Sequence, residues 1–577
     1  MIAQVVFDLP LDGPFDYLIP EHLVSQMSVG ARVKVSLGHM SQIGFVTGLL
    51  EQSAVPQLKP VQSLCDPSPA FNILDLTFAK DFCAYYGCSV GEALGTMLRN
   101  KTDFSFTCRR DHTQVFSLYI CQPNVYAVKI QGIIDGYPRD SRFLILVPDA
   151  FRAQSLSQQI KAAGSVKIGS RSAVFECDGR YDCIIMVDED DPSYKQEQMP
   201  MYETRQVLLM RSRSYGFDIA FVGISPSVEL MAMVRDDQVE LIEEATAKLA
   251  LAKVVDLSNY KFIPGLLSPP VRDALDAALK AGQKSILILN RRGSYRLTRC
   301  VDCAEILKCS HCDSALIYSR AEGKFLCRHC TYTVPGDIVC PKCHKSSWRS
   351  MGIGVEQLQT ELKKYFPQAR ITAFERATKS TEKTSKPLGD FDILISTSAV
   401  LRFQGEWRVQ VAAFIDFDAQ LNRLDVRCGF NAFSLALHIC SMALEGVFIQ
   451  TRNTSHYVLQ SLSSGAIKNF YDEELKLRKE FGFSPFRHWV KISWRGKVEK
   501  STHQAAVEVY NALSQSAPKT FTITPPLADA VGRKRDLFRF NVMVQADHVP
   551  PLVAFIKSTL ALVKRRSRVI VTLNVDP

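Results

Sequence analysis

Eight of the chain's 17 cysteines lie between residues 300 and 343, where they form four C-x-x-C pairs. Two thiolates in such a pair can bind one metal ion without strain, and a structural zinc ion takes four ligands in a tetrahedron. Because the chain has no secretory features, the four pairs predict two four-cysteine zinc sites rather than disulfides. The spacing suggests a nested arrangement around a hairpin over residues 315–325. We expect one zinc ion on the inner pairs, Cys309, Cys312, Cys327 and Cys330, and one on the outer pairs, Cys300, Cys303, Cys340 and Cys343.

The length and charge of the chain limit what it can be. A chain of 577 residues is too long for a single core and predicts about three to five domains. Its start lacks a basic segment followed by a long apolar run, and no later stretch reaches about 18 apolar residues. We therefore expect a cytoplasmic protein with no membrane partner. The formal net charge of +10 favours a polyanionic partner without identifying one.

The periodicity of apolar residues predicts a multidomain α/β fold. Short alternating runs at the start predict a β-rich domain, which a helical connector follows. Two later blocks alternate buried strand runs with helices, which predicts two parallel α/β lobes. The strand runs assigned to the first lobe are residues 142–149, 181–190, 218–225 and 252–258.

The cysteine segment interrupts the second lobe after its first strand, and an α+β domain ends the chain. The expected divisions are the β-rich domain with its connector, the first lobe, the start of the second lobe, the zinc insert, the remainder of the second lobe and the C-terminal domain: residues 1–100, 101–260, 261–299, 300–345, 346–465 and 466–577.

Four segments in a fixed order point to one known family. They are LDGPFDYLIP with the following ARVKVSLG, residues 169–205, NRRGSYRLTRCVDC at 290–303 and FYDEELKLRKEFGFSPF at 470–486. In this order they resemble the PriA family of primosomal replication-restart helicases. The resemblance implies a domain that binds the 3′ end of DNA, two RecA-like lobes and a zinc-ribbon-type insert. It also implies a function in replication restart at stalled-fork or branched DNA.

The resemblance implies a pocket for the 3′-terminal nucleotide, formed by Phe15, Asp16, Tyr17, Gly38 and Lys59. An aromatic ring can stack on a splayed base, and a carboxylate can accept a hydrogen bond from a 3′-hydroxyl. We expect Asp16 to select the hydroxyl and the two rings to stack. The alternative is that Phe15 and Tyr17 are core residues and Asp16 is a turn residue.

A second candidate for DNA contact is VGRKRDLFRF at 531–540. Its basic residues Arg533, Lys534 and Arg535 suit phosphate contacts, and its phenylalanines suit base stacking. Phe538 and Phe540 also alternate with polar residues, as the residues of an ordinary half-buried strand do. Both interpretations stay open at this stage.

The chain departs from the family pattern where ATP should bind. It contains no G-x-x-x-x-G-K-[ST] loop, which holds the phosphates and Mg²⁺ in such motors. Residues 122–141 stand in its place, with Gly132 and Gly136 but no Gly-Lys-Ser/Thr. Asp188 and Glu189 remain as a degenerate acidic pair, which without bound phosphate we expect to be solvated acids at a strand end. The arginine-finger segment is also replaced, by SLALHICSMALEG, so the sequence does not support an ATP–Mg²⁺ site.

The resulting hypothesis is a replication-restart primosome protein whose helicase engine no longer hydrolyses ATP. The resemblance implies three kinds of partner: forked or 3′-ended DNA, other primosome proteins and single-stranded-DNA-binding protein. One alternative is an active ATP-dependent 3′-5′ DNA helicase with a divergent nucleotide loop. Another is a zinc-ribbon protein-interaction scaffold without a DNA role. ATP hydrolysis stimulated by forked DNA would favour the first alternative, and absence of salt-sensitive DNA binding would favour the second.

Overall fold

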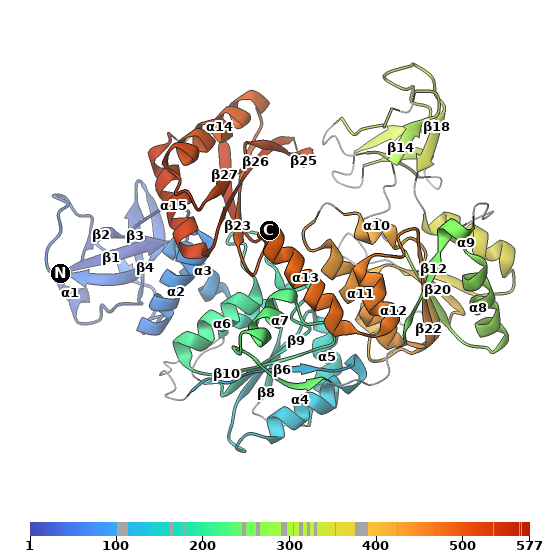
Figure 1. The fold of residues 1–577 in the computed structure, drawn as a ribbon. Coiled ribbons are helices and arrows are strands. Elements are labelled where there is room, and N and C mark those ends of the chain that lie inside the picture. Colours follow the sequence, from blue (N-terminus) through green and yellow to red (C-terminus); the bar gives the residue numbers. More distant parts are fainter. Residues whose placement is uncertain are drawn as a thin grey trace.

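The computed structural model describes most of the chain and arranges it in six sheets (Figure 1). The described residues are 1–100, 113–161, 166–176, 180–244, 250–260, 266–289, 297–303, 305–310, 315–319, 323–327, 332–351, 354–374, 390–423, 425–534, 536–564, 566 and 568–577. Within these ranges no helix has the length and apolar character needed to cross a membrane.

The N-terminal sheet is antiparallel, with the strand order β2-β1-β4-β3-β5. Two helices follow it, as the sequence predicts. The first of them begins at a capping box, in which the Asn72 side chain accepts from the Asp75 backbone N–H at 2.8 Å, and ends at Gly87 with φ 72°. The elements are β1 (Ile2–Phe7), β2 (Phe15–Leu18), α1 (Glu21–Val24), β3 (Arg32–Leu37), β4 (Met40–Leu50), β5 (Ser63–Leu64), α2 (Ile73–Tyr86) and α3 (Val90–Asn100).

The first lobe is a parallel sheet with the strand order β11-β6-β10-β9-β7-β8. Its central strands are buried along their whole length, which is typical of a parallel sheet covered on both faces. The elements are β6 (Phe116–Ile120), α4 (Tyr126–Asp135), β7 (Phe143–Leu146), α5 (Ala150–Gln159), β8 (Val166–Gly169), β9 (Cys183–Val187), α6 (Thr204–Tyr215), β10 (Asp218–Gly223), α7 (Val228–Arg235) and β11 (Glu240–Glu244).

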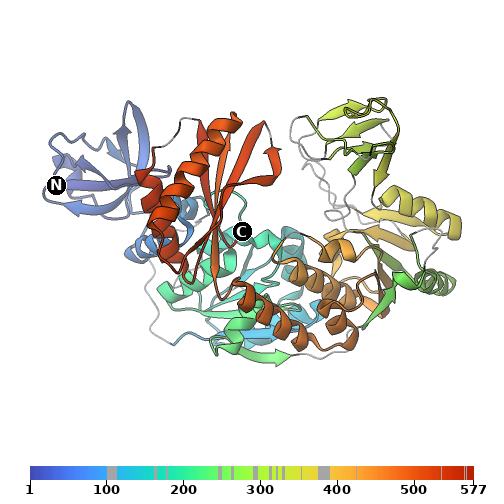
Figure 2. The same cartoon turned by 45° about the horizontal axis from the view of Figure 1, so that its top comes forward.

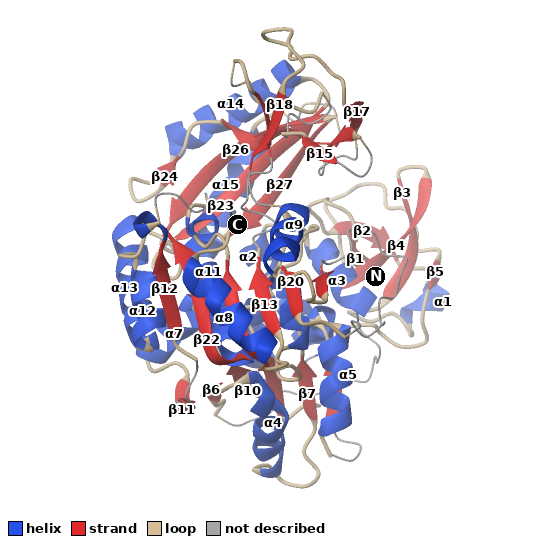
Figure 3. Ribbon diagram, turned by 90° about the vertical axis from the view of Figure 1, so that its right-hand side faces the viewer, coloured by secondary structure: helices blue, strands red, loops and turns tan. Residues whose placement is uncertain are grey.

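The second lobe is also parallel, with the strand order β12-β22-β21-β13-β20-β19. Figure 3 shows α8 in front of its strands, and α11 packs on the opposite face of the sheet, in a separate cluster of core residues. The elements are β12 (Ala252–Asp256), α8 (Pro269–Lys280), β13 (Ser285–Ile288), α9 (Val355–Tyr365), β19 (Ile371–Phe374), β20 (Ile393–Ser396), β21 (Val409–Phe414), α10 (Asp418–Leu421), α11 (Cys428–Met442), β22 (Ala443–Thr451) and α12 (Tyr457–Ser464).

One strand was assigned to the wrong lobe from the sequence. The run at 252–258 was expected in the first lobe, but β12 pairs in parallel with β22 and is an edge strand of the second sheet. An apolar run predicts a strand but not its partner, because strand pairing is decided by packing elsewhere in the fold. The first parallel sheet therefore ends with β11, and the chain crosses to the second lobe before Ala252.

The cysteine insert carries two small antiparallel sheets and stands apart from the other domains, at the far end of the second lobe (Figures 1 and 2). The expected hairpin is present, because β15 and β16 pair in antiparallel register. The strands are β14 (Leu297–Cys300), β15 (Ile317–Ser319), β16 (Lys324–Leu326), β17 (Thr333–Pro335) and β18 (Trp348–Met351).

The C-terminal domain is an antiparallel sheet with two helices on one face, and it lies between the N-terminal sheet and the two lobes in Figure 1. It shares one hydrophobic core with α2, α3 and the first lobe, since Ile492 and Leu552 belong to the same cluster as Phe82 and Leu208. The elements are α13 (Ile467–Phe481), β23 (His488–Gly496), α14 (Glu499–Ser516), β24 (Thr522–Ile523), β25 (Leu527–Lys534), β26 (Leu537–Ala546), α15 (Val549–Leu562) and β27 (Val569–Val575).

Candidate nucleotide cleft, metal centre and DNA-binding surfaces

The loop after β6 lies where a phosphate-binding loop would lie in a motor lobe. Ligands of parallel α/β sheets bind beyond the carboxyl ends of the strands. Here β6 passes through the short 3₁₀ turn Pro123–Val125 directly into α4. Gly132 lies inside α4 and Gly136 is its C-cap residue, so neither glycine belongs to the loop. This turn has no run of glycines whose backbone N–H groups could surround a phosphate.

A segment of the second lobe, residues 403–408, packs against this turn. Gly405 has φ +84°, and a Cβ at that position would lie 3.0 Å from the Pro123 carbonyl oxygen. A side chain at residue 405 would therefore force one of the two backbones to shift. The Ser155 hydroxyl also donates to the Glu406 carboxylate at 3.0 Å. We call residues 403–408 the interlobe segment, because it joins the second lobe to the mouth of the first.

The Asp188 carboxylate accepts three hydrogen bonds from protein groups. The Tyr126 hydroxyl donates at 2.6 Å, the Arg152 guanidinium at 2.7 Å and the Gln404 amide at 2.8 Å. Asp188 follows β9 with φ 46° and is only 2% exposed. The expectation of a solvated acid is therefore wrong, because burial of this carboxylate is balanced by donors from both lobes.

Glu189 is also buried rather than solvated. Its carboxylate accepts from the Arg205 guanidinium at 2.7 Å and from the Ser227 backbone N–H at 2.6 Å. Burial raises the pKa of Glu189, and the opposing effect of Arg205 and Ser227 does not fully cancel it. Both groups belong to the first lobe, so Glu189 holds that lobe together.

Asp190 connects the two lobes through hydroxyl groups. Its carboxyl accepts from Ser225 at 2.9 Å and from Ser434 of α11 at 2.7 Å. Burial, together with the charges of Asp188 and Glu189, raises its pKa well above the usual value. His438, one turn along α11, lies 3.2 Å from the Ser225 hydroxyl, and burial lowers its pKa.

This arrangement does not fit a nucleotide–magnesium group. Asp188, Asp190 and His438 offer ligand atoms within 4.8 Å of one another, but the Arg152 guanidinium is already bonded to Asp188. A cation beside that carboxylate opposes a second cation, and the raised pKa of the buried Asp190 disfavours the ionised form that a metal ion would need. The sequence did not indicate Tyr126, Arg152 or Gln404, because none of them belongs to a recognisable motif.

Glu229, a further largely buried acid, ties the lobes to the C-terminal part of the chain. Glu229 of α7 lies 2.9 Å from the Arg478 guanidinium of α13 and 3.7 Å from Arg427 of the second lobe. Burial would raise the pKa of Glu229, but Arg427, Arg478 and Arg205 outweigh it and lower the pKa. The carboxylate therefore stays ionised and holds together α7, the second lobe and α13.

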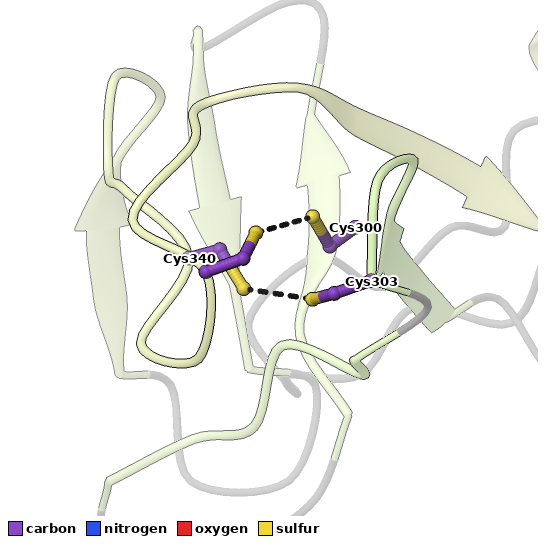
Figure 4. A group of neighbouring side chains, drawn as sticks. Cys300, Cys303 and Cys340 are labelled. Carbon is purple, nitrogen blue, oxygen red and sulfur yellow. Dashed lines mark hydrogen bonds between the residues drawn. The ribbon is translucent and has the colours of Figure 1, made fainter.

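The outer cysteines of the insert form a group that can hold a metal ion (Figure 4). The sulfur atoms of Cys300 and Cys343 are 3.5 Å apart, as are those of Cys303 and Cys340. This places the two outer C-x-x-C pairs together, as the nested arrangement requires. Four convergent thiols fit a tetrahedral zinc ion, because thiolates are its preferred structural ligands.

The inner cysteines are described only in part. Cys309 and Cys327 are buried in the small core of the insert, which also contains Phe325. Cys312 and Cys330 lie outside the described residues. The inner site therefore remains a prediction from the sequence.

The N-terminal pocket residues divide between the two faces of β2. Tyr17 is only 4% exposed, lies in the core of the N-terminal sheet, and donates from its hydroxyl to the Ser36 carbonyl at 3.0 Å. The predicted stacking role of Tyr17 is wrong in this conformation, because its ring is needed for packing. Phe15, two residues away, is half-buried against the same core, with its ring centroid 5.8 Å from that of Phe7.

Asp16 points to the opposite face of β2, since side chains alternate along a strand. Its carboxylate accepts from the Ser53 hydroxyl at 2.5 Å, and the Asp16 side chain is partly exposed. The exposed Lys59 ammonium donates to the Gly38 carbonyl at 2.6 Å. Asp16, Gly38 and Lys59 thus remain accessible from solvent, whereas Tyr17 does not.

The basic segment of the tail forms one side of a hairpin. Arg533 stands opposite Phe538, and Lys534 stands opposite Leu537, in the pairing of β25 with β26. Arg535 lies outside the described residues. Phe540 packs against the shared core, as expected for a half-buried strand residue.

Comparison with known proteins shows which proteins the chain resembles. A sequence profile described as the 3′DNA-binding domain (3′BD) matches residues 4–99. Replication restart protein PriA of Treponema pallidum is 25% identical over 653 aligned residues, which cover 100% of this chain and 99% of the relative. The chain is similar to this PriA protein over its whole length. PriA of Rickettsia conorii is 22% identical over 648 aligned residues, again covering 100% of this chain and 99% of the relative.

Other matches are partial. PriA of Bacillus subtilis is 24% identical over 432 aligned residues, which cover 71% of this chain and 53% of that relative. Among solved structures, S. cerevisiae Dbp5 bound to RNA and ADP BeF3 matches with a TM-score of 0.33 and 8% identity over 67% of this chain and 96% of that chain. The 3′BD match runs from within β1 into α3, so it covers the N-terminal sheet and both helices after it.

The bonding of Asp188 predicts a structural role that a stability measurement can detect. Asp188→Ala leaves the buried Arg152 without its partner, and such losses cost about 3–5 kcal/mol. We expect the thermal unfolding midpoint, followed by circular dichroism, to fall by about 5 °C or more. Glu240→Ala, which removes an exposed acid of β11, serves as the control and should leave the midpoint unchanged. Equal midpoints for the two variants would contradict the bonding described.

Proposed function

We propose that this chain is a replication-restart primosome protein that recognises stalled-fork or branched DNA and acts as a non-hydrolysing pseudo-helicase. The full-length similarity to PriA proteins and the 3′DNA-binding profile over residues 4–99 support the DNA-directed part. The observation that carries the pseudo-helicase part is the bonding of Asp188 to Tyr126, Arg152 and Gln404. A protein working at replication forks would act in the cytoplasm of a bacterium.

An active ATP-dependent 3′-5′ helicase is the second candidate, and the cleft argues against it. Nucleotide binding would require the interlobe segment to move away from the turn at Pro123. It would also bring Mg²⁺ close to Asp188, which is already bonded to the Arg152 guanidinium. Phosphoryl transfer also needs the phosphates held in line and their developing charge neutralised. The turn after β6 offers no group for the first task, and Arg152, which could serve the second, is bonded to Asp188.

The proposed partners are forked or 3′-ended DNA, other primosome proteins and single-stranded-DNA-binding protein. A protein-interaction scaffold with no DNA role is less favoured, because the N-terminal profile is that of a DNA-binding domain. Within the proposed function, Asp16, Gly38 and Lys59 contact the 3′ end, with Phe15 at the edge of the same site. Arg533, Lys534 and Arg535 contact the DNA backbone.

The cysteine insert is proposed to bind two zinc ions per chain. The grouping of Cys300, Cys303, Cys340 and Cys343 supports the outer site, and the C-x-x-C spacing supports the inner one. Each ion would fix a turn of the insert, since structural zinc contributes about 10–16 kcal/mol of apparent binding free energy in small modules.

Metal analysis tests the zinc proposal. Protein purified without chelator should contain two zinc ions, and Cys300→Ser should reduce that number by one, because a site with three thiolates binds more weakly. Cys65→Ser, which changes an exposed cysteine of the N-terminal domain, should retain both ions. One ion or none in the unaltered protein would refute the two-site proposal.

The 3′-end proposal predicts discrimination between DNA ends. The unaltered chain should bind a fork with a 3′-hydroxyl more tightly than one with a 3′-phosphate, because the phosphate would repel the Asp16 carboxylate. Asp16→Asn should reduce this preference by about ten-fold, since hydrogen bonds to charged groups are worth about 1.5–3 kcal/mol. Fluorescence anisotropy measures both affinities.

Glu21→Gln is the matched control for Asp16→Asn, because Glu21 is an exposed acid of the same domain, on α1. It should keep the preference of the unaltered chain. Equal affinity of the unaltered chain for the two DNA ends would count decisively against the proposed pocket.

The pseudo-helicase proposal predicts no catalysis. With forked DNA and Mg-ATP, both ATP turnover and strand separation should stay at background, and Glu189→Gln should not change either rate. Glutamine keeps the size of the side chain and can still accept from Ser227, which protects the fold. DNA-stimulated turnover that Glu189→Gln abolishes would establish an active motor and overturn this proposal.

A further inference from the structure

The C-terminal sheet has one covered face and one open face. On β23, Val490, Ile492 and Trp494 are buried in the shared core beneath α14 and α15. The residues between them, Lys491, Ser493 and Arg495, point to the opposite face and are partly exposed. In Figures 1 and 2 the two helices lie on the side of this sheet that is turned away from the cysteine insert. The open face is polar.

Two arginines stand side by side on this open face. Arg495 of β23 is directly opposite Arg539 of β26 in the antiparallel register. Residues opposite each other on antiparallel strands have Cβ atoms about 4.5–5.5 Å apart, and like charges in such positions repel. In the next row Ser493 is opposite Asn541, and the Ser493 hydroxyl donates to the Asn541 side-chain oxygen at 2.7 Å.

Neither arginine of this pair has an acidic partner among the described residues, and the Nε atom of each is buried without a hydrogen-bond partner. A buried donor that lacks a partner costs free energy, so such groups are rare in folded proteins. Burial and the neighbouring Arg539 charge lower the pKa of Arg495. The pair is therefore electrostatically unfavourable without a bound anion.

Other cations of the same domain are neutralised within the protein. Lys491 lies 3.7 Å from the Asp529 carboxylate, Arg487 lies 2.9 Å from Asp547, and Arg566 lies 2.6 Å from Glu508. Exposed lysines such as Lys497 and Lys500 are surrounded by water, whereas the arginine pair is partly buried and its Nε atoms have no partner among the described residues. The contrast indicates that the missing negative charge comes from a ligand.

We propose that Arg495 and Arg539 together bind a backbone phosphate of DNA. Two guanidinium groups offer several N–H donors to one phosphate and balance its charge, which suits a phosphodiester oxygen. Arg539 is two residues beyond Leu537, which stands opposite Lys534 in the hairpin, so the pair lies next to the basic segment along the same sheet. A polyanionic strand can span both positions, whereas a free phosphate ion can occupy only one.

This inference deepens the proposed DNA binding and rests on it, so the experiment separates the two. The full-length chain is titrated against labelled forked DNA at several NaCl concentrations. Arg495→Gln and Arg539→Gln should each weaken binding about ten-fold and reduce the slope of log affinity against log salt by about one contact. The double variant should lose little more than either single variant, because both side chains hold the same phosphate.

The control is Lys500→Gln, which removes an exposed positive charge from α14 on the helical side of the same domain. It should leave the salt slope unchanged. The thermal midpoint supplies a second readout, because a like-charged pair without acids does not stabilise the fold. Arg495→Gln should therefore keep or raise the midpoint, whereas a purely structural arginine would lower it.

Several outcomes would overturn the inference. If the unaltered chain binds forked DNA and Arg495→Gln binds it equally well with the same salt slope, the pair is not a DNA site. If inorganic phosphate raises the midpoint in an Arg495-dependent way while DNA affinity does not depend on Arg495, the site binds free phosphate instead. If the unaltered chain does not bind DNA at all, the proposed function itself fails.

Discussion

A carboxylate that leaves water must find donors or positive charge, and this requirement fixes how the two lobes sit together. Asp188 obtains its donors from the first lobe and from Gln404 of the second. Glu229 obtains its positive charge from Arg427 and from Arg478. Separating the lobes would leave these acids short of partners, so the closed arrangement satisfies itself without a bound nucleotide. The acidic groups that could take part in catalysis in a motor hold the two lobes together in this chain.

The first lobe is also packed tightly against the C-terminal domain, but the cysteine insert is not part of this packing. A single core joins α2 and α3, the first lobe and the C-terminal sheet, so these parts hold a fixed relation to one another. The insert has a separate small core and is attached through the second lobe. Candidate contacts for DNA therefore lie on a rigid frame. The cysteine group lies in the insert, which is held together by its own small core and by the proposed metal binding rather than by that frame.

The sequence predicted features that local spacing determines and missed those that depend on distant partners. The outer cysteines could be paired from the C-x-x-C turns, and the buried strands could be found from their apolar runs. The burial of Asp188 could not be predicted from the sequence, because its partner Gln404 is 216 residues away. The run at 252–258 gave a strand but the wrong lobe. Tyr17 fitted both a pocket and a core, since alternation along β2 does not say which face is open. The match of Arg495 with Arg539 requires the register of two strands that a whole helix separates.

The contact between Gly405 and Pro123 has a consequence for how such a chain could change over generations. A methyl group at residue 405 would lie 3.0 Å from the Pro123 carbonyl oxygen, on a backbone with φ +84°, so it would strain this contact and force one backbone to shift. A glycine-rich loop inserted after β6 would meet the same obstacle. Regaining a nucleotide site would thus demand coordinated substitutions in two lobes far apart in the sequence, with weakened intermediates between them. If the chain is the proposed pseudo-helicase, single substitutions could refine its scaffold but would not restore a nucleotide site.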